Sequence, residues 1–190
     1  MDRRILTIVL LLAAMCSSFH VEAQEKSKTQ FVLSTNIVDW ANLLTLNLEA
    51  GVGFHQHFSV QAGAKYNNLD FAKGELFCHQ TTAYAGARYW PWYVFSGWWL
   101  GAQARYTKYE ETGLWRPALD TGTAIGCGLS IGYTLMLNDK LNLEFGTGIW
   151  TGRRYEYTLY CCPNCMDVRE SGPSGFLAMN DISLAVMYVF

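Results

Sequence analysis

Residues 178–190 carry the pattern that most restricts how this chain can fold. Bulky apolar side chains occupy every second position up to a C-terminal aromatic residue: Ile182, Leu184, Val186, Tyr188 and Phe190. The positions between them hold smaller or more polar residues, such as Asp181 and Ser183. A period of two places alternate side chains on opposite faces of a β-strand. The chain is therefore predicted to end in a strand with one bulky apolar face.

This ending resembles the C-terminal signal that outer-membrane barrel proteins present to their insertion machinery. The resemblance implies a chain that crosses the membrane with strands of about 9–11 residues rather than with apolar helices. The N-terminus agrees with an exported protein. Residues 2–4 are charged and residues 5–15 form an apolar run, and Val21 and Ala23 are small residues at the −3 and −1 positions of a cleavage site. This pattern predicts a cleaved signal peptide over residues 1–23.

The remaining chain, residues 24–190, is predicted to form one barrel domain. Apolar residues make up 51% of the chain and aromatic residues 15%, yet the mean hydropathy is only +0.05. A barrel produces this combination because lipid-facing and lumen-facing residues alternate. No stretch has about 18 successive apolar residues, so no transmembrane helix is predicted. The net charge of −2 gives no reason to expect nucleic-acid binding, which needs a basic patch.

Alternation and turn residues predict an all-β fold, an eight-stranded antiparallel up-and-down transmembrane barrel. The predicted strands lie near residues 31–38, 44–54, 57–67, 81–90, 97–108, 120–137, 140–154 and 178–190. If the N-terminus is periplasmic, the periplasmic turns are short. The long connections are then predicted to be external loops: 68–80, 109–119 and 155–177. This asymmetry is typical of outer-membrane barrels.

The two faces of the strands indicate what surrounds the barrel. A soluble lipocalin-type barrel would turn large apolar residues inward, but eight strands leave a lumen better suited to small side chains and a few paired charges. The bulky face is therefore predicted to meet lipid, with aromatic girdles at both interfaces. The periplasmic girdle is predicted to hold Phe54, Phe58, Trp90, Trp92, Tyr93, Phe95, Trp98 and Phe190, and the outer one Tyr66, Tyr106, Tyr109 and Tyr155.

Five charged residues fall on the predicted lumen side: Glu49, Lys65, Arg88, Arg105 and Glu144. Charges in such a narrow space must be paired and hydrogen-bonded. They predict a polar plug that ties the strands together. The alternative is a gate or a narrow ion path.

The cysteines suggest a staple between external loops. Four of them are placed outside the barrel: Cys78, Cys161, Cys162 and Cys165. In an oxidising compartment they predict disulfides of undetermined connectivity, with free thiols or a metal site as alternatives. Cys127 is predicted to face lipid. Cys16 raises a lipoprotein alternative, which the preceding Met15 disfavours.

The loop 155–177 is the predicted place for binding a partner. Tyrosine and arginine, which are favoured at recognition hot spots, gather at its start: Arg153, Arg154, Tyr155, Tyr157 and Tyr160. The alternative is that the arginines reach lipid headgroups and the tyrosines join the outer girdle. An enzyme is not expected. The only external histidine, His79, would support at most a lipid-modifying site at the barrel rim.

Three short motifs resemble the family known as domain of unknown function 3575: Ser34-Thr35-Asn36, Leu46-Asn47-Leu48-Glu49 and Arg88-Tyr89-Trp90-Pro91. The resemblance covers most of residues 24–190 and implies a small outer-membrane barrel, loosely associated with surface-fibre gene sets, with no known reaction. We therefore expect a structural or surface-interaction role, with a narrow pore and a rim lipid-modifying enzyme as alternatives. The expected partners are outer-membrane lipid, the insertion machinery and a surface-fibre or envelope protein. No cofactor is expected.

Overall fold

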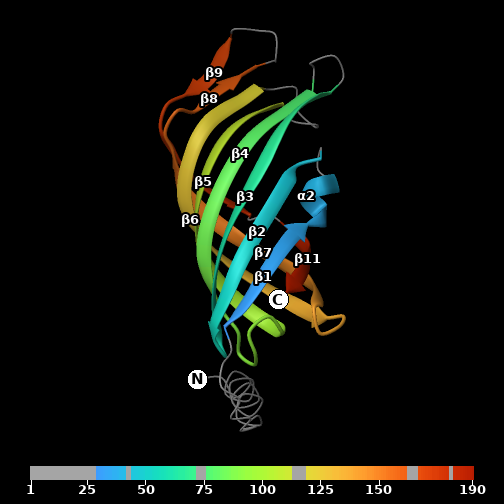
Figure 1. Ribbon diagram of the computed structural model, residues 1–190. Coiled ribbons are helices and arrows are strands. Elements are labelled where there is room, and N and C mark those ends of the chain that lie inside the picture. Colours follow the sequence, from blue (N-terminus) through green and yellow to red (C-terminus); the bar gives the residue numbers. More distant parts are fainter. Residues whose placement is uncertain (1–28, 42–43, 72–75, 113–118, 162–166, 180–181) are drawn as a thin grey trace, which may run out of the picture.

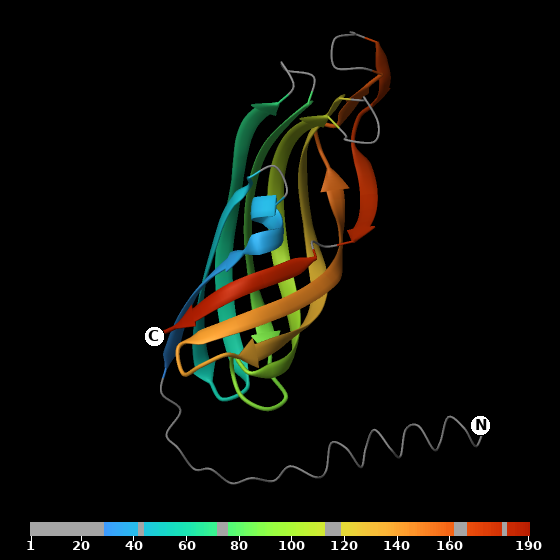
Figure 2. The ribbon, with the colours of Figure 1, turned by 90° about the vertical axis from the view of Figure 1, so that its right-hand side faces the viewer.

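The computed structural model describes residues 29–41, 44–71, 76–112, 119–161, 167–179 and 182–190. Within these ranges the strands form one sheet whose ends meet in a tall barrel (Figure 1, Figure 2). The strands are β1 (Gln30–Asn36), β2 (Leu46–His55), β3 (Phe58–Phe71), β4 (Leu76–Tyr89), β5 (Gly97–Thr112), β6 (Leu119–Met136), β7 (Leu141–Arg154), β8 (Thr158–Tyr160), β9 (Val168–Ser171), β10 (Ser174–Met179) and β11 (Ser183–Val189). A short helix, α2 (Ile37–Ala41), follows β1.

Antiparallel pairing between successive strands builds the wall from β1 to β7, and β1 also pairs with β11 to close it. β10 and β11 succeed each other along β7 and form the eighth strand of the barrel. The predicted eight-stranded antiparallel barrel is therefore confirmed. The predicted signal peptide lies outside the described residues. We call the end with the short β2–β3, β4–β5 and β6–β7 connections the turn end, and the end with β8 and β9 the hairpin end.

The external loops are shorter than the sequence predicts, because much of each predicted loop belongs to a strand. β3 and β4 stay paired as far as Phe71 and Leu76, and β5 and β6 as far as Thr112 and Leu119. In the segment 155–177, β8 pairs with both β6 and β9. These extensions lose the apolar alternation but keep their backbone hydrogen bonds, so a hydrophobic pattern does not detect them.

The alternation in the last strand is broken, contrary to the prediction for residues 178–190. Met179 pairs with Ile149, whereas Ser183 pairs with Gly146, so the register shifts by one residue between them. Such a shift exchanges the two faces of a strand. Met179 consequently points outward and is 71% exposed, although a continuous alternation would turn it inward.

Helix α2 replaces the end of the first predicted strand, which is expected to reach residue 38. The Asn36 side-chain oxygen accepts hydrogen bonds from the backbone N–H groups of Val38 at 3.2 Å and Leu184 at 3.0 Å. The first is a helix N-cap. The second joins the cap to β11. Asn36 therefore ends β1, begins α2 and stabilises the closing seam of the barrel, the pairing of β1 with β11.

Outward positions carry an exposed apolar belt, as the alternation predicts. It includes Leu33, Leu48, Val60, Tyr89, Leu100, Leu129, Ile131, Ile149, Leu177 and Ile182. Many inward positions are buried and polar: Ser34, Gln61, Lys65, Thr82, Arg105, Thr107, Thr134 and Glu144. In the described part of the chain, no helix is long and apolar enough to cross a membrane.

Candidate functional site

An ion-pair layer crosses the lumen and is centred on Arg88. Its guanidinium lies 3.0 Å from Glu49 Oε1 and 3.1 Å from Glu144 Oε2, and its carbon lies 4.4 Å from the ring centroid of Trp99. The Thr134 hydroxyl donates to Glu144 at 3.3 Å. The structure therefore brings together three of the five predicted lumen charges, from β2, β4 and β7.

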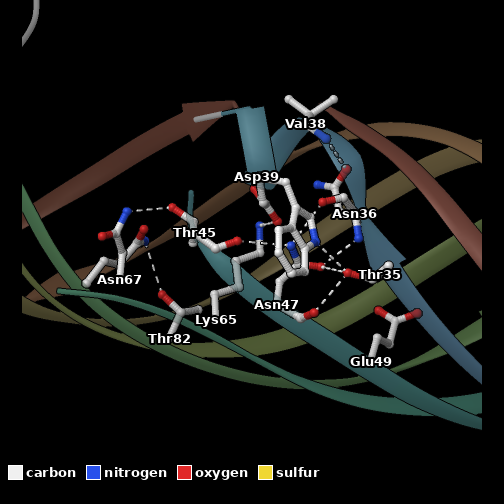
Figure 3. Close-up of polar contacts among 12 residues, drawn as sticks. Thr35, Asn36, Val38, Asp39, Thr45, Asn47, Glu49, Lys65, Asn67 and Thr82 are labelled. Carbon is white, nitrogen blue, oxygen red and sulfur yellow. Dashed lines mark hydrogen bonds and ion pairs between the residues drawn. The ribbon is translucent and has the colours of Figure 1, made fainter. Parts of the chain in front are cut away.

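Lys65 belongs to a separate ion pair that the sequence pattern misses. Its Nζ lies 2.8 Å from Oδ2 of Asp39, the buried residue of α2 (Figure 3). Next to this pair, the Asn47 amide bonds the backbone of Asn36, and the Trp40 indole donates to Thr35. Asp39 therefore joins Glu49 and Glu144 as a third paired carboxylate among the described lumen residues. The ion pair and the amide contacts together fasten α2 over the end of β1.

Replacing Asp39 with asparagine is expected to lower the free energy of unfolding by about 1.5–3 kcal/mol, the range for hydrogen bonds to charged groups. Asparagine keeps the shape but cannot neutralise Lys65. The urea midpoint of the refolded barrel measures the effect. The control is Asp139→Asn in the exposed β6–β7 turn, and an equally small shift for both variants would contradict a structural role for the ion pair.

Arg105 does not join the Arg88 layer but begins a column of cations and rings directed toward the hairpin end. Its guanidinium carbon lies 5.2 Å from the ring centroid of Trp150, which meets Phe176 edge-to-face at 4.4 Å. Arg154 then lies 5.4 Å from Phe176 and 4.8 Å from Tyr157. Cation–π and aromatic contacts of this kind stabilise the packing between the strands that supply them. The column ties β5 and β7 to β10.

An apolar plug fills the lumen at the turn end. Its buried members are Val32, Trp90, Phe95, Trp99 and Met187. The indole of Trp90 donates to Ser59 Oγ at 2.9 Å. Trp90 and Phe95 are therefore wrongly assigned to the periplasmic girdle, because the β4–β5 connection folds back into the barrel. Phe95 adopts a positive φ of 63° there, and its carbonyl accepts from the Asn142 amide at 2.9 Å.

Little free space remains between the charges of the lumen. The cavity beside Arg88, Glu144 and Trp99 measures about 70 Å³. Each buried water needs about 10–15 Å³ of such space, so the cavity holds a few waters and no larger solute. The ion-pair layer and the apolar plug therefore act as two successive closures of the lumen, which favours the predicted polar plug over the alternative of a gate or a narrow ion path.

The predicted binding residues of the segment 155–177 divide between the two faces. Arg153 and Tyr155 are exposed, whereas Arg154 and Tyr157 belong to the inward column, and Tyr160 is half-buried in β8. Only Arg153 and Tyr155 are thus placed to meet lipid headgroups or a partner from outside.

Two ionisable groups at the hairpin end have altered acidity. Burial raises the pKa of the Asp120 carboxyl, and Glu170 raises it further while Arg154 lowers it. Burial also raises the pKa of Tyr157, with Asp120 adding to the effect. Both groups lie beyond the apolar belt.

The positions of the described cysteines agree only in part with the prediction. Cys78 is buried inside β4 rather than in a loop, and His79 follows it in the same strand. Cys127 is exposed on the outward face of β6, as predicted, and Cys161 is exposed just after β8. Cys162 and Cys165 lie outside the described residues, so the disulfides stay a prediction. Among the described side chains, no group of three or more His, Cys, Asp or Glu is arranged to hold a metal ion.

The C-terminal residues of the predicted insertion signal lie on the outward face of β11 and just beyond its ends. Ile182, Tyr188 and Phe190 are exposed, and Leu184 and Val186 are half-buried. The rings of Tyr188 and Phe190 meet edge-to-face at 4.9 Å, and the Phe190 N–H bonds the Phe31 carbonyl at 2.9 Å. The aromatic terminus is therefore held at the turn end of the closing seam.

A family model described as Protein of unknown function (DUF3575) matches residues 7–190. No curated protein and no solved structure matches the chain. The three motifs that resemble this family lie at the features described above. Asn36 and Asn47 fasten α2, Glu49 and Arg88 form the ion-pair layer, and Trp90 fills the plug. These motifs therefore supply the contacts that close the barrel.

Proposed function

We propose, from the premise that this chain belongs to the DUF3575 family of proteins of unknown function, that it is an outer-membrane barrel with a closed lumen. Its role is to hold the hairpin end at the cell surface for contact with a partner. The observation that carries this proposal is the exposed apolar belt around a polar, ion-paired interior. Water does not stabilise such an outer surface, whereas lipid does.

The orientation follows from the two ends of the barrel. The short turns and the aromatic C-terminus lie together, as in barrels whose turn end faces the periplasm (Figure 2). The hairpin of β8 and β9 extends from the opposite end and would face the exterior (Figure 1). The insertion machinery would then recognise the Tyr188–Phe190 terminus, and lipid would surround the belt. A surface-fibre or envelope protein is the proposed class of partner, on the basis of the family association.

The alternatives receive less support from the geometry. A pore would need a continuous path, but the Arg88 layer and the apolar plug lie across it in succession. A rim enzyme would need an activated nucleophile near the outer leaflet. His79, the residue considered for that role, is a strand residue paired with Asn68 and Glu110 rather than a loop residue. We therefore propose a non-enzymatic role.

Epitope insertion tests the proposed location and orientation together. A tag placed within 162–166, between β8 and β9, is expected to bind antibody on intact cells. The matched tag within 138–140, at the turn end, is expected to bind only after the outer membrane is permeabilised. Purified residues 24–190 should also need detergent to stay folded, with an unheated gel band that shifts on boiling. Reversed accessibility of the tags, or a folded chain in plain buffer, would overturn the proposal.

A further inference from the structure

Two grooves of different chemistry cross the outer wall of the barrel, one above the other. The first, the polar groove, measures about 550 Å³ and runs across β3, β4, β5 and β6 toward the hairpin end. Its lining comes from two neighbouring rows of outward side chains and includes Tyr66, Thr81, Lys108, Thr123, His79 and Glu110. The alternation of exposed and buried positions along these strands places the groove on the outside of the barrel.

The second, the apolar groove, measures about 530 Å³ and lies nearer the middle of the belt. Small residues form its floor and larger ones its sides: Ala85, Ala104, Cys127, Leu129, Ile149 and Leu177. These residues are exposed on the outward faces of β4, β5, β6, β7 and β10. Because alanine and cysteine replace the bulky residues found elsewhere on the belt, the wall is hollowed at this point.

The two grooves share β5 and β6 and are aligned along the barrel axis. The centre of the apolar groove lies at the Gln103–Gly128 pair and that of the polar groove at the Tyr109–Gly122 pair. These pairs are six residues apart along each strand, or about 20 Å at 3.3 Å per residue. A single outward row, with Tyr106 and Ile125, separates the grooves. An amphiphile of phospholipid length would span both.

The charges follow the order of groups in a phospholipid. Outward positions along β5 run from Ala102 and Ala104 through Tyr106 to Lys108 and then Glu110. Arg153 adds a second cation on β7, opposite Ile125. Within the described residues, no ion pair joins Lys108 or Arg153 to a carboxylate. A phosphate next to the acyl chains would meet the cations, and an ammonium group beyond it would meet Glu110.

We propose that this surface binds one glycerophospholipid with an amine headgroup, the acyl chain lying in the apolar groove and the phosphate and ammonium in the polar groove. The inference rests on the proposed membrane location. The lipid would fill the hollow in the belt and satisfy Lys108 and Glu110 at once. A lipid that carries phosphate but no amine would satisfy only the cations.

Lipid titration of the purified barrel in detergent, followed by native mass spectrometry, tests the headgroup. Phosphatidylethanolamine is expected to bind more tightly than phosphatidylglycerol with the same acyl chains. Lys108→Gln should weaken both lipids about fivefold, since one basic residue near a lipid surface contributes about 1 kcal/mol. Glu110→Gln should weaken phosphatidylethanolamine alone, by a similar factor. Lys140→Gln, at the exposed turn end, is the control and should change neither.

A second pair of variants tests the acyl part. Ala104→Phe fills the apolar groove and should weaken both lipids, whereas Ala50→Phe, an outward alanine of β2 away from the groove, should not. Soluble glycerophosphoethanolamine should compete poorly, because it lacks the acyl chains. Equal binding of all headgroups, or full competition by the soluble compound, would overturn this inference. The epitope experiment reports separately on the membrane location.

Discussion

Replacing Arg88 with leucine is expected to lower the free energy of unfolding by about 3–5 kcal/mol, the cost of removing one partner from a buried ion pair. Arg88 neutralises two carboxylates, Glu49 and Glu144, at 3.0 and 3.1 Å. Leucine leaves both of them buried among the strands of the lumen without their cation. The variant should therefore refold poorly, and its folded fraction should disappear at much lower urea concentrations than that of the native chain.

A charge-balanced variant separates electrostatics from packing. Adding Glu49→Gln and Glu144→Gln to Arg88→Leu removes the buried negative charges and should recover most of the lost stability. Arg153→Leu is the matched control, because this arginine is exposed on the outward face and surface substitutions usually change stability by no more than about 0.5 kcal/mol. If the triple variant were as unstable as Arg88→Leu, the loss would come from packing around Trp99 rather than from unpaired charge.

The period of two predicts the barrel and the inward direction of the lumen charges, because strict alternation leaves no other face for them. It cannot predict their partners. Pairing depends on register across strands far apart in the sequence, such as that joining Glu49 to Arg88. Asp39 is missed for a different reason. The first strand ends two residues earlier than expected, and only the N-capping potential of Asn36 could have indicated the helix that carries this carboxylate.

The sequence pattern also fails to predict the apolar plug, which involves more residues than the missed Asp39. Aromatic residues near a strand end suggest an interfacial girdle, and the sequence between β4 and β5 contains several. Their direction depends on the turn, where Phe95 and Gly97 both adopt positive φ values and the chain folds into the lumen. Gly97 is a recognisable signal for such a backbone, but Phe95 is not. Hydrophobicity alone therefore could not separate Trp90, which is fully buried, from Trp92, which is 41% exposed.

Replacing Trp90 with alanine is the second variant with a large expected effect. The side chain is fully buried, contacts Phe95 and Trp99, and bonds Ser59 through its indole. Truncating a buried tryptophan typically costs about 3–5 kcal/mol, through lost burial and the cavity left behind. Trp92→Ala, two residues away on the exposed side of the same turn, should cost far less. The difference between their urea midpoints measures the contribution of the plug.

Trp90→Ala, compared with the native barrel, also tests whether the lumen conducts. The native barrel in a planar bilayer is expected to show no current above the lipid baseline, since the plug and the ion-pair layer close the lumen in succession. Trp90→Ala disrupts only the apolar plug and should also pass no current, because Arg88 still bridges β2, β4 and β7. Steady ion-selective steps from the native protein would contradict a closed lumen. Steps from Trp90→Ala alone would show instead that the apolar plug is the only seal and that the ion-pair layer is permeable.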